Sequence, residues 1–147
     1  MAMKKRIALI TGATRGIGKE ISLALAKEDI HVILLGRTIG ALEEISDKIH
    51  LNGGNATCVQ FDLSDLNKIY DLSHEIKERW GKLDILISNA AYLHNLTPLS
   101  HLSDKDWQIS ININLSANWL LIKHFEKLLL ESENGKAIFI TLSLIHI

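Results

Sequence analysis

The sequence predicts an α/β protein built on a doubly wound parallel sheet. Short, almost wholly apolar runs alternate with longer stretches in which apolar residues recur at helical spacing. Uninterrupted apolar runs are typical of strands buried on both faces, and the longer pattern is typical of amphipathic helices. This alternation continues along the chain, which favours a parallel sheet covered by helices on both sides.

The first half of the chain contains three predicted strands. A strand at 7–10 leads through a glycine-rich turn into a helix at 16–26, and a second strand follows at 30–35. Ile39, Leu42, Ile45 and Ile49 share one face of a helix at 39–50, which the breaker sequence at 52–55 ends. A third strand is expected at 57–61.

The second half continues the same pattern. A helix is expected from 66 to 76, stopped by Gly81, and then a strand at 85–87. A loop at 90–103 holds the only proline, and Ser103 or Asp104 is placed to cap one long helix ending near 130. A fifth strand follows at 137–141. Right-handed crossovers between such strands give a Rossmann-type sheet, so residues 1–147 are expected to form a single domain.

Composition narrows the classes of function. The chain has 147 residues, 47% of them hydrophobic, and a formal net charge of -1. These values suit one globular domain and argue against a nucleic-acid binder, which would carry excess basic charge. The lone Cys58 excludes an internal disulfide and a cysteine-based zinc cluster, and the histidines show no metal-binding spacing. The apolar run near the N-terminus is too short for a signal peptide or a membrane span, so we expect a cytoplasmic protein.

The turn after the first strand is rich in glycine. Gly12 permits a sharp turn, Gly16 lets the backbone approach a pyrophosphate, and Gly18 lets the helix pack closely on the sheet. The helix N-terminus offers unpaired N–H groups and a partial positive charge to phosphates. This strand-turn-helix context favours a dinucleotide site over the alternative of a purely structural turn.

The turn and two later segments resemble the classical short-chain dehydrogenases/reductases. Residues 11–18 match the TGxxxGxG motif, and Asp62 matches the aspartate that binds the adenine. Residues 88–91 resemble the NNAG motif but depart from it at Ser88 and Ala91. The resemblance implies a cofactor site made of Gly12, Thr14, Arg15, Gly16, Ile17, Gly18, Arg37, Asp62, Leu63, Asn89, Ala90 and Ala91. Asp62 has an alternative role as a helix cap.

Two catalytic residues are implied by the same resemblance. Asn114, seven residues after Trp107, falls at the catalytic asparagine, and Ser143 falls at the catalytic serine. Asn112 is a neighbouring candidate in the same helix, and Ser143 has the alternative of an ordinary serine at a strand end. Asparagine is unfavourable inside helices, so at least one of the pair is expected to have a specific role.

The end of the second strand favours NADP(H) over NAD(H). An acidic residue at this place usually binds the ribose 2′-hydroxyl, but here Gly36 occupies it and Arg37 follows. Arg15 in the glycine turn lies near the same corner, and two guanidinium groups suit a 2′-phosphate. The alternative is that both arginines are simply solvated.

The resemblance implies hydride transfer between nicotinamide and a small carbonyl or secondary alcohol. A 3-oxoacyl-carrier-protein-reductase-like role is one possibility, and an intact enzyme is expected to be a homo-oligomer. Neither Tyr70 nor Tyr92 begins the family's Tyr-x-x-x-Lys pair, so the chain is expected to be incomplete at its C-terminus and inactive by itself. The alternatives are an NADP-binding module without catalysis, or a fragment without function. Three tryptophans, Trp80, Trp107 and Trp119, are expected to pack against the sheet or between helices.

Overall fold

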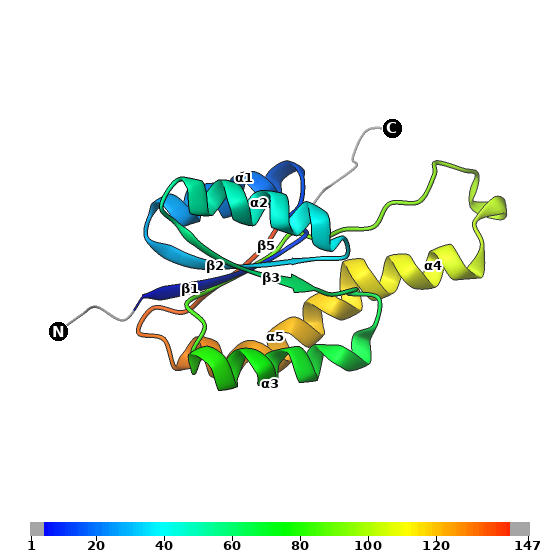
Figure 1. Ribbon diagram of the computed structural model, residues 1–147. Coiled ribbons are helices and arrows are strands. Elements are labelled where there is room, and N and C mark those ends of the chain that lie inside the picture. The colour runs from blue at the N-terminus through cyan, green and yellow to red at the C-terminus, as the bar shows by residue number, and fades with distance from the viewer. Residues whose placement is uncertain (1–4, 142–147) are drawn as a thin grey trace.

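The computed structural model describes residues 5–141 and shows a five-stranded parallel sheet between two layers of helices (Figure 1). The strand order is β3-β2-β1-β4-β5, and every neighbouring pair is parallel. The strands are β1 (Arg6–Thr11), β2 (Ile30–Gly36), β3 (Asn55–Gln60), β4 (Ile85–Ser88) and β5 (Lys136–Phe139). The predicted fold class is confirmed.

The helices divide between the two faces of the sheet. Helices α1 (Gly16–Lys27) and α2 (Ile39–Leu51) cover one face, and α3 (Ile69–Trp80) and α5 (Ala117–Leu130) cover the other (Figure 1). A short 3-10 turn, η1 (Leu66–Lys68), leads into α3, and Gly81 ends that helix in the left-handed conformation with φ 71°. The predicted stop at Gly81 is therefore confirmed.

The all-apolar strands are explained by two separate cores. In β1, Ala8 and Ile10 pack with residues of α1 and α2, whereas Ile7 and Leu9 pack with residues of α3 and α5. Side chains alternate between faces along a strand, so a sheet covered on both sides needs apolar residues at every position. The uninterrupted apolar sequence of the strands and the presence of two cores both follow from a sheet that helices cover on both faces.

The sheet has a switch point between β1 and β4. From β1 the chain builds outward through β2 to β3, and it then returns to place β4 and β5 on the opposite side of β1. The loops after β1 and β4 consequently diverge above the carboxyl ends of these strands. Open α/β sheets bind ligands in the crevice that such a divergence creates.

The predicted long helix is continuous but contains a π-helical turn. Helix α4 (Asp104–Ile111) leads into η3 (Asn112–Ser116), which continues directly into α5. The amide of Ala117 donates to the carbonyl of Asn112, one residue beyond the α-helical partner. The predicted cap is also confirmed, because the Ser103 hydroxyl accepts a hydrogen bond from the amide of Asp106 at 3.1 Å.

Two expectations about side chains and boundaries were wrong. The third strand begins at Asn55 rather than at 57, because residues 55–60 pair in register with residues 31–36 of β2. Trp107 and Trp119 are 55% and 60% exposed, so only Trp80 packs against a core.

Along the part of the chain that the structure describes, no helix has the length and apolarity needed to cross a membrane. A second 3-10 turn, η2 (Leu99–His101), lies within the predicted loop.

Candidate functional site

The glycine turn lies at the carboxyl end of β1, and each glycine there has its own reason. A Cβ on Gly18 would lie 2.3 Å from the carbonyl oxygen of Gly12, so this residue has no room for a side chain. Gly12 has φ 65° and would place a Cβ 3.0 Å from Cα of Ala90. Gly16 has φ 53°, and a Cβ built on it meets no described atom within 4 Å, so the space beside its Cα is open. Two glycines thus close the turn, and the third leaves space in front of it.

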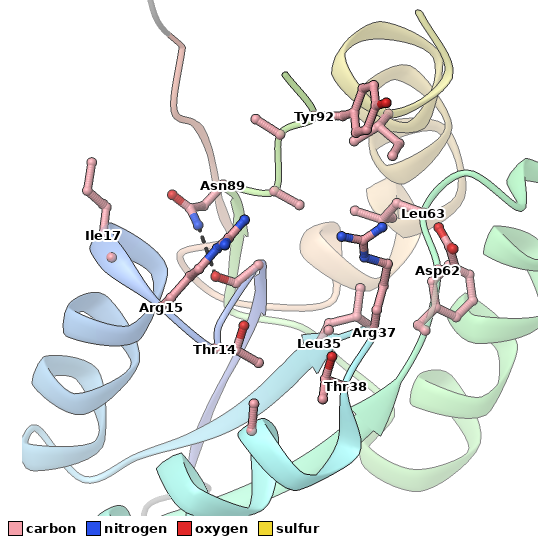
Figure 2. A pocket seen from close by; sticks show the side chains of 18 residues that line it. Thr14, Arg15, Ile17, Leu35, Arg37, Thr38, Asp62, Leu63, Asn89 and Tyr92 are labelled. Carbon is pink, nitrogen blue, oxygen red and sulfur yellow. Dashed lines mark hydrogen bonds between the residues drawn. The ribbon is translucent and has the colours of Figure 1, made fainter. Parts of the chain in front are cut away.

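Asn89 and Thr11 hold the ends of β4 and β1 together. The Thr11 hydroxyl accepts from the backbone amides of Asn89 and Ala90, both at 3.0 Å. The side-chain amide of Asn89 donates to the carbonyls of Thr11 and Gly12, both at 3.2 Å. Figure 2 shows the bond to Gly12. These bonds fix the spacing of the two loops that border the crevice. Thr11 was not among the predicted site residues, although its place at the end of the first strand was a usable signal.

The end of β2 presents polar groups but no carboxylate. Gly36 is followed by the exposed Arg37 and by Thr38, which is the N-cap residue of α2. The Thr38 side chain makes no capping hydrogen bond, so its hydroxyl is free to serve another partner at this helix N-terminus. A Cβ on Gly36 would meet the side chains of Thr14 and Leu42 at 3.1 and 3.2 Å. Thr38 is a second residue that the sequence reasoning missed.

Asp62 lies beyond β3 on the side of Arg37. Its Oδ1 atom accepts from both the amide and the hydroxyl of Ser64, at 2.9 and 2.8 Å. Burial by itself raises the pKa of Asp62, but the Ser64 bonds and the charges of Arg37 and Lys68 together lower it, so the carboxyl is ionised. The alternative role as a helix cap is not observed, because η1 begins at Leu66 with Asp65 as its N-cap residue, and the local bonds of Asp62 to Ser64 use only one of its two carboxylate oxygens.

These segments surround one cavity of about 790 Å³. Every predicted cofactor residue except Gly18 lines it, and Gly18 lies buried beneath the turn. Figure 2 shows Arg15 and Arg37 reaching up from two separate turns, with Asp62 and Tyr92 on the side of Arg37. The cavity has the size of a cofactor pocket. Its lining also includes residues outside the predicted cofactor set, namely Leu35, Gly36, Thr38, Ala41, Phe61, Tyr92 and Ile113.

The two predicted catalytic residues have different outcomes. Asn114 lies in the π-helical turn, where its Oδ1 accepts from the amide of Tyr92 at 2.9 Å and its Nδ2 donates to the carbonyl of Tyr92 at 2.8 Å. Its side chain thus holds the loop after β4, and its neighbour Ile113 is the η3 residue that lines the cavity. Ser143 lies outside the described residues.

Comparison with known proteins assigns the family. The family model described as short chain dehydrogenase matches residues 6–144. The chain belongs to this family. The resemblance seen in the sequence motifs is therefore confirmed over nearly the full chain.

Individual relatives agree with this assignment. The chain is 33% identical over 141 residues to a 3-oxoacyl-[acyl-carrier-protein] reductase of Synechocystis, covering 95% of this chain and 57% of that protein. It is also 33% identical over 144 residues to a sepiapterin reductase of Chlorobaculum tepidum, covering 93% and 59%. The chain thus spans a little over half the length of these curated relatives.

Solved structures match the fold closely. A metagenomic short-chain oxidoreductase in complex with NADP superimposes with a TM-score of 0.87 and 29% identity, covering 91% of this chain and 61% of the other. A short-chain dehydrogenase from Escherichia coli CFT073 complexed with NADPH gives a TM-score of 0.85 and 31% identity, covering 91% and 57%. The family is one of NAD(P)-dependent oxidoreductases.

Proposed function

We propose that the chain is the NADP(H)-binding part of an oxidoreductase that acts on a small carbonyl compound or secondary alcohol. The observation that carries the choice of NADP(H) is the corner at the end of β2. Arg15, Arg37 and the free hydroxyl of Thr38 all line the cavity there, and Gly36 stands in place of an acidic residue. Two guanidinium groups, a hydroxyl and a helix N-terminus suit a 2′-phosphate dianion.

The rest of the cavity fits the other parts of a dinucleotide. The open space beside Gly16 and the start of α1 would hold the pyrophosphate, because Arg15 at the N-cap position forms no side-chain cap there. Asp62 would accept from the adenine amino group through the oxygen that Ser64 leaves unused, beside Leu63. Asn89, Ala90 and Ala91 would line the nicotinamide half.

The reaction class follows from the family. Bound nicotinamide supplies or accepts the hydride, and the protein orients it and excludes water. We assign Asn114 and Ser143 to the catalytic positions of the intact enzyme, and a 3-oxoacyl thioester is the best-supported substrate because the Synechocystis relative is a reductase of that class. We propose that this 147-residue chain alone binds cofactor without turnover, since it contains no Tyr-x-x-x-Lys sequence and general acid–base catalysis contributes roughly 10²–10⁴-fold.

A catalytically silent NADP-binding module is the second candidate. It is favoured by the use of both ends of the Asn114 side-chain amide to hold Tyr92. Both candidates require the same cofactor site. Turnover of a 3-oxoacyl thioester with NADPH by the chain would exclude the silent module.

Titration with NADPH and NADH, followed by nicotinamide fluorescence and melting temperature, tests the cofactor. We expect tighter binding of NADPH, and we expect Arg37→Ala to weaken NADPH binding roughly tenfold while leaving NADH nearly unchanged, because one charged hydrogen-bond donor to the phosphate is lost. Arg79→Ala is the matched control, because Arg79 lies over the ring of Trp80 at 4.7 Å and outside the cavity lining. Equal affinity for both nucleotides would contradict the assignment, and Gly16→Asp should abolish binding of either.

A further inference from the structure

A chain of hydrogen bonds runs from the end of β4 to the cavity wall through a residue that the family motifs do not include. The hydroxyl of Ser88 donates to Oδ1 of Asn118, and Nδ2 of Asn118 donates to the carbonyl of Asn114 at 2.8 Å. Asn114 in turn holds both backbone groups of Tyr92, at 2.9 and 2.8 Å. Ser88 is buried at 3% exposure, and it is also a position where this chain departs from the family motif.

The direction of these bonds gives each residue a separate task. Within a π-helical turn the backbone bonds shift by one residue, as the bond from Ala117 to Asn112 shows. The side-chain amide of Asn118, four residues after Asn114, supplies a donor to the Asn114 carbonyl. An amide has a donor end and an acceptor end, and the Asn114 carbonyl can only accept, so it faces Nδ2 of Asn118 and leaves Oδ1 toward β4. The Ser88 hydroxyl donates to that Oδ1 atom and so holds the amide in place, and Asn118 supports the turn that carries Asn114.

We infer that Ser88 and Asn118 are positioning residues that keep Asn114 in place and, through it, the Tyr92 wall of the cavity. Tyr92 lines the cavity between the loop after β4 and η3. Its hydroxyl also donates to Asp106 at 2.9 Å, so the residue is anchored to α4 and to η3 at once. The consequence for NADP(H) rests on the proposed function. The positioning itself is a property of the chain without cofactor.

Hydrogen exchange at the Tyr92 amide measures the positioning directly, because this amide donates to Asn114. The first variant is Asn118→Asp, which keeps an acceptor for Ser88 but places a second carboxylate oxygen against the Asn114 carbonyl. The second is Ser88→Ala, a smaller change that frees the Asn118 amide to rotate. We expect either variant to speed exchange at Tyr92 roughly threefold to tenfold relative to the core amide of Ile33, the change expected for losing one hydrogen bond. The double variant should add little to the Asn118→Asp effect, because both residues act on the same step.

Gln108→Leu is the matched control. Gln108 donates to the Asn112 side chain at 2.8 Å, which is also a bond across four residues of the same long helix, but it does not reach Tyr92. Unchanged exchange at Tyr92 in Ser88→Ala and Asn118→Asp, or an equal increase in Gln108→Leu, would overturn the inference. If Asn118→Asp does not fold, Ser88→Ala decides alone.

The NADPH affinity of the same variants separates this inference from the proposed function. Weaker binding in Ser88→Ala and Asn118→Asp, with Gln108→Leu unchanged, would support the wall's contribution to the cofactor site. If the parent chain binds no NADPH, the proposed function fails, while the exchange rates at Tyr92 still decide the positioning role.

Discussion

At the scale of single residues, replacing Gly18 or Gly40 by alanine is expected to change the free energy of unfolding in opposite directions. Gly18→Ala would place its Cβ 2.3 Å from a backbone oxygen, whereas a Cβ on Gly40 meets no described atom within 4 Å. Gly18→Ala should lower the free energy of unfolding by roughly 2 kcal/mol because the turn has to move. Gly40→Ala should raise it by about 0.5 kcal/mol, because alanine restricts the unfolded chain in favour of helix α2. Urea unfolding of both variants checks the pair, and a stable Gly18→Ala protein would refute the close packing of the turn.

A second prediction at this scale concerns pH and His31. Burial first, and then the charges of Arg79, Lys5 and His50, lower the pKa of His31 below the usual histidine value of 6.5. Its ring also bonds to the Thr57 hydroxyl at 2.9 Å and lies against Trp80. Because the unfolded chain binds this proton more readily than the folded one, stability is full above pH 6.5 and falls as the pH drops toward the folded pKa.

Replacement of His31 tests this contribution. His31→Gln should flatten the dependence of stability on pH just below 6.5, measured by urea unfolding at closely spaced pH values. His101→Gln, in the exposed loop before α4, serves as the control. An unchanged pH profile in His31→Gln would show that other groups produce the slope.

At the scale of elements, Asp84 joins three parts of the sheet. Its Oδ2 accepts from the backbone amide of Ile7 in β1 at 2.8 Å, and its Oδ1 accepts from Lys82 at 2.9 Å and from Ser132 before β5 at 2.5 Å. Burial by itself raises the pKa of Asp84, but the bonds from Ser132, Lys82 and Ile7 lower it overall. One buried carboxylate thus aligns the amino ends of β1, β4 and β5.

Asp84→Asn should cost about 2–4 kcal/mol of the free energy of unfolding, because the amide cannot accept from all three donors and the partly buried Lys82 loses its counter-charge. Asp29→Asn is the control, since Asp29 pairs with Lys5 at 2.7 Å but is 87% exposed and should change stability by less than about 0.5 kcal/mol. Thermal or urea unfolding of the two variants is the measurement. Equal effects would mean that Asp84 contributes no more than a surface ion pair.

At the scale of the whole molecule, the exposed apolar residues of the long helix favour self-association. Trp107, Leu115 and Trp119 are 55%, 63% and 60% exposed and follow one another along α4, η3 and α5. We propose that they contribute to the oligomer interface of the protein, because large apolar side chains left exposed along one helix are candidates for an association site. This replaces the expectation that both tryptophans pack inside the chain.

Sedimentation velocity tests the interface. Trp119→Glu should shift the chain from dimer or larger toward monomer at micromolar concentration, because a charge would be buried in the contact. Leu51→Glu changes a more exposed apolar side chain, 86% exposed at the end of α2, and should leave the distribution unchanged. A parent chain that is monomeric throughout this range would contradict the proposal.

The sequence by itself determined the sheet, its two helical layers and most of the residues around the cavity. Apolar runs, glycine spacing and breaker residues are local signals, so they can be recognised without knowing which segments pack against one another in the fold. The motif residues from Gly12 to Ala91 were predicted together because each follows a strand, and parallel strands bring their carboxyl ends to one edge.

Only the tertiary structure decided how these residues support one another. The π-helical turn at Asn112–Ser116, the bonds from Ser88 through Asn118 to Asn114, and the free hydroxyl of Thr38 have no local signature. The exposure of Trp107 and Trp119 likewise depends on which face of the long helix meets the rest of the fold. Hydrogen bonds between segments far apart in sequence depend on their spacing and orientation in the fold, and a one-dimensional pattern does not carry that information.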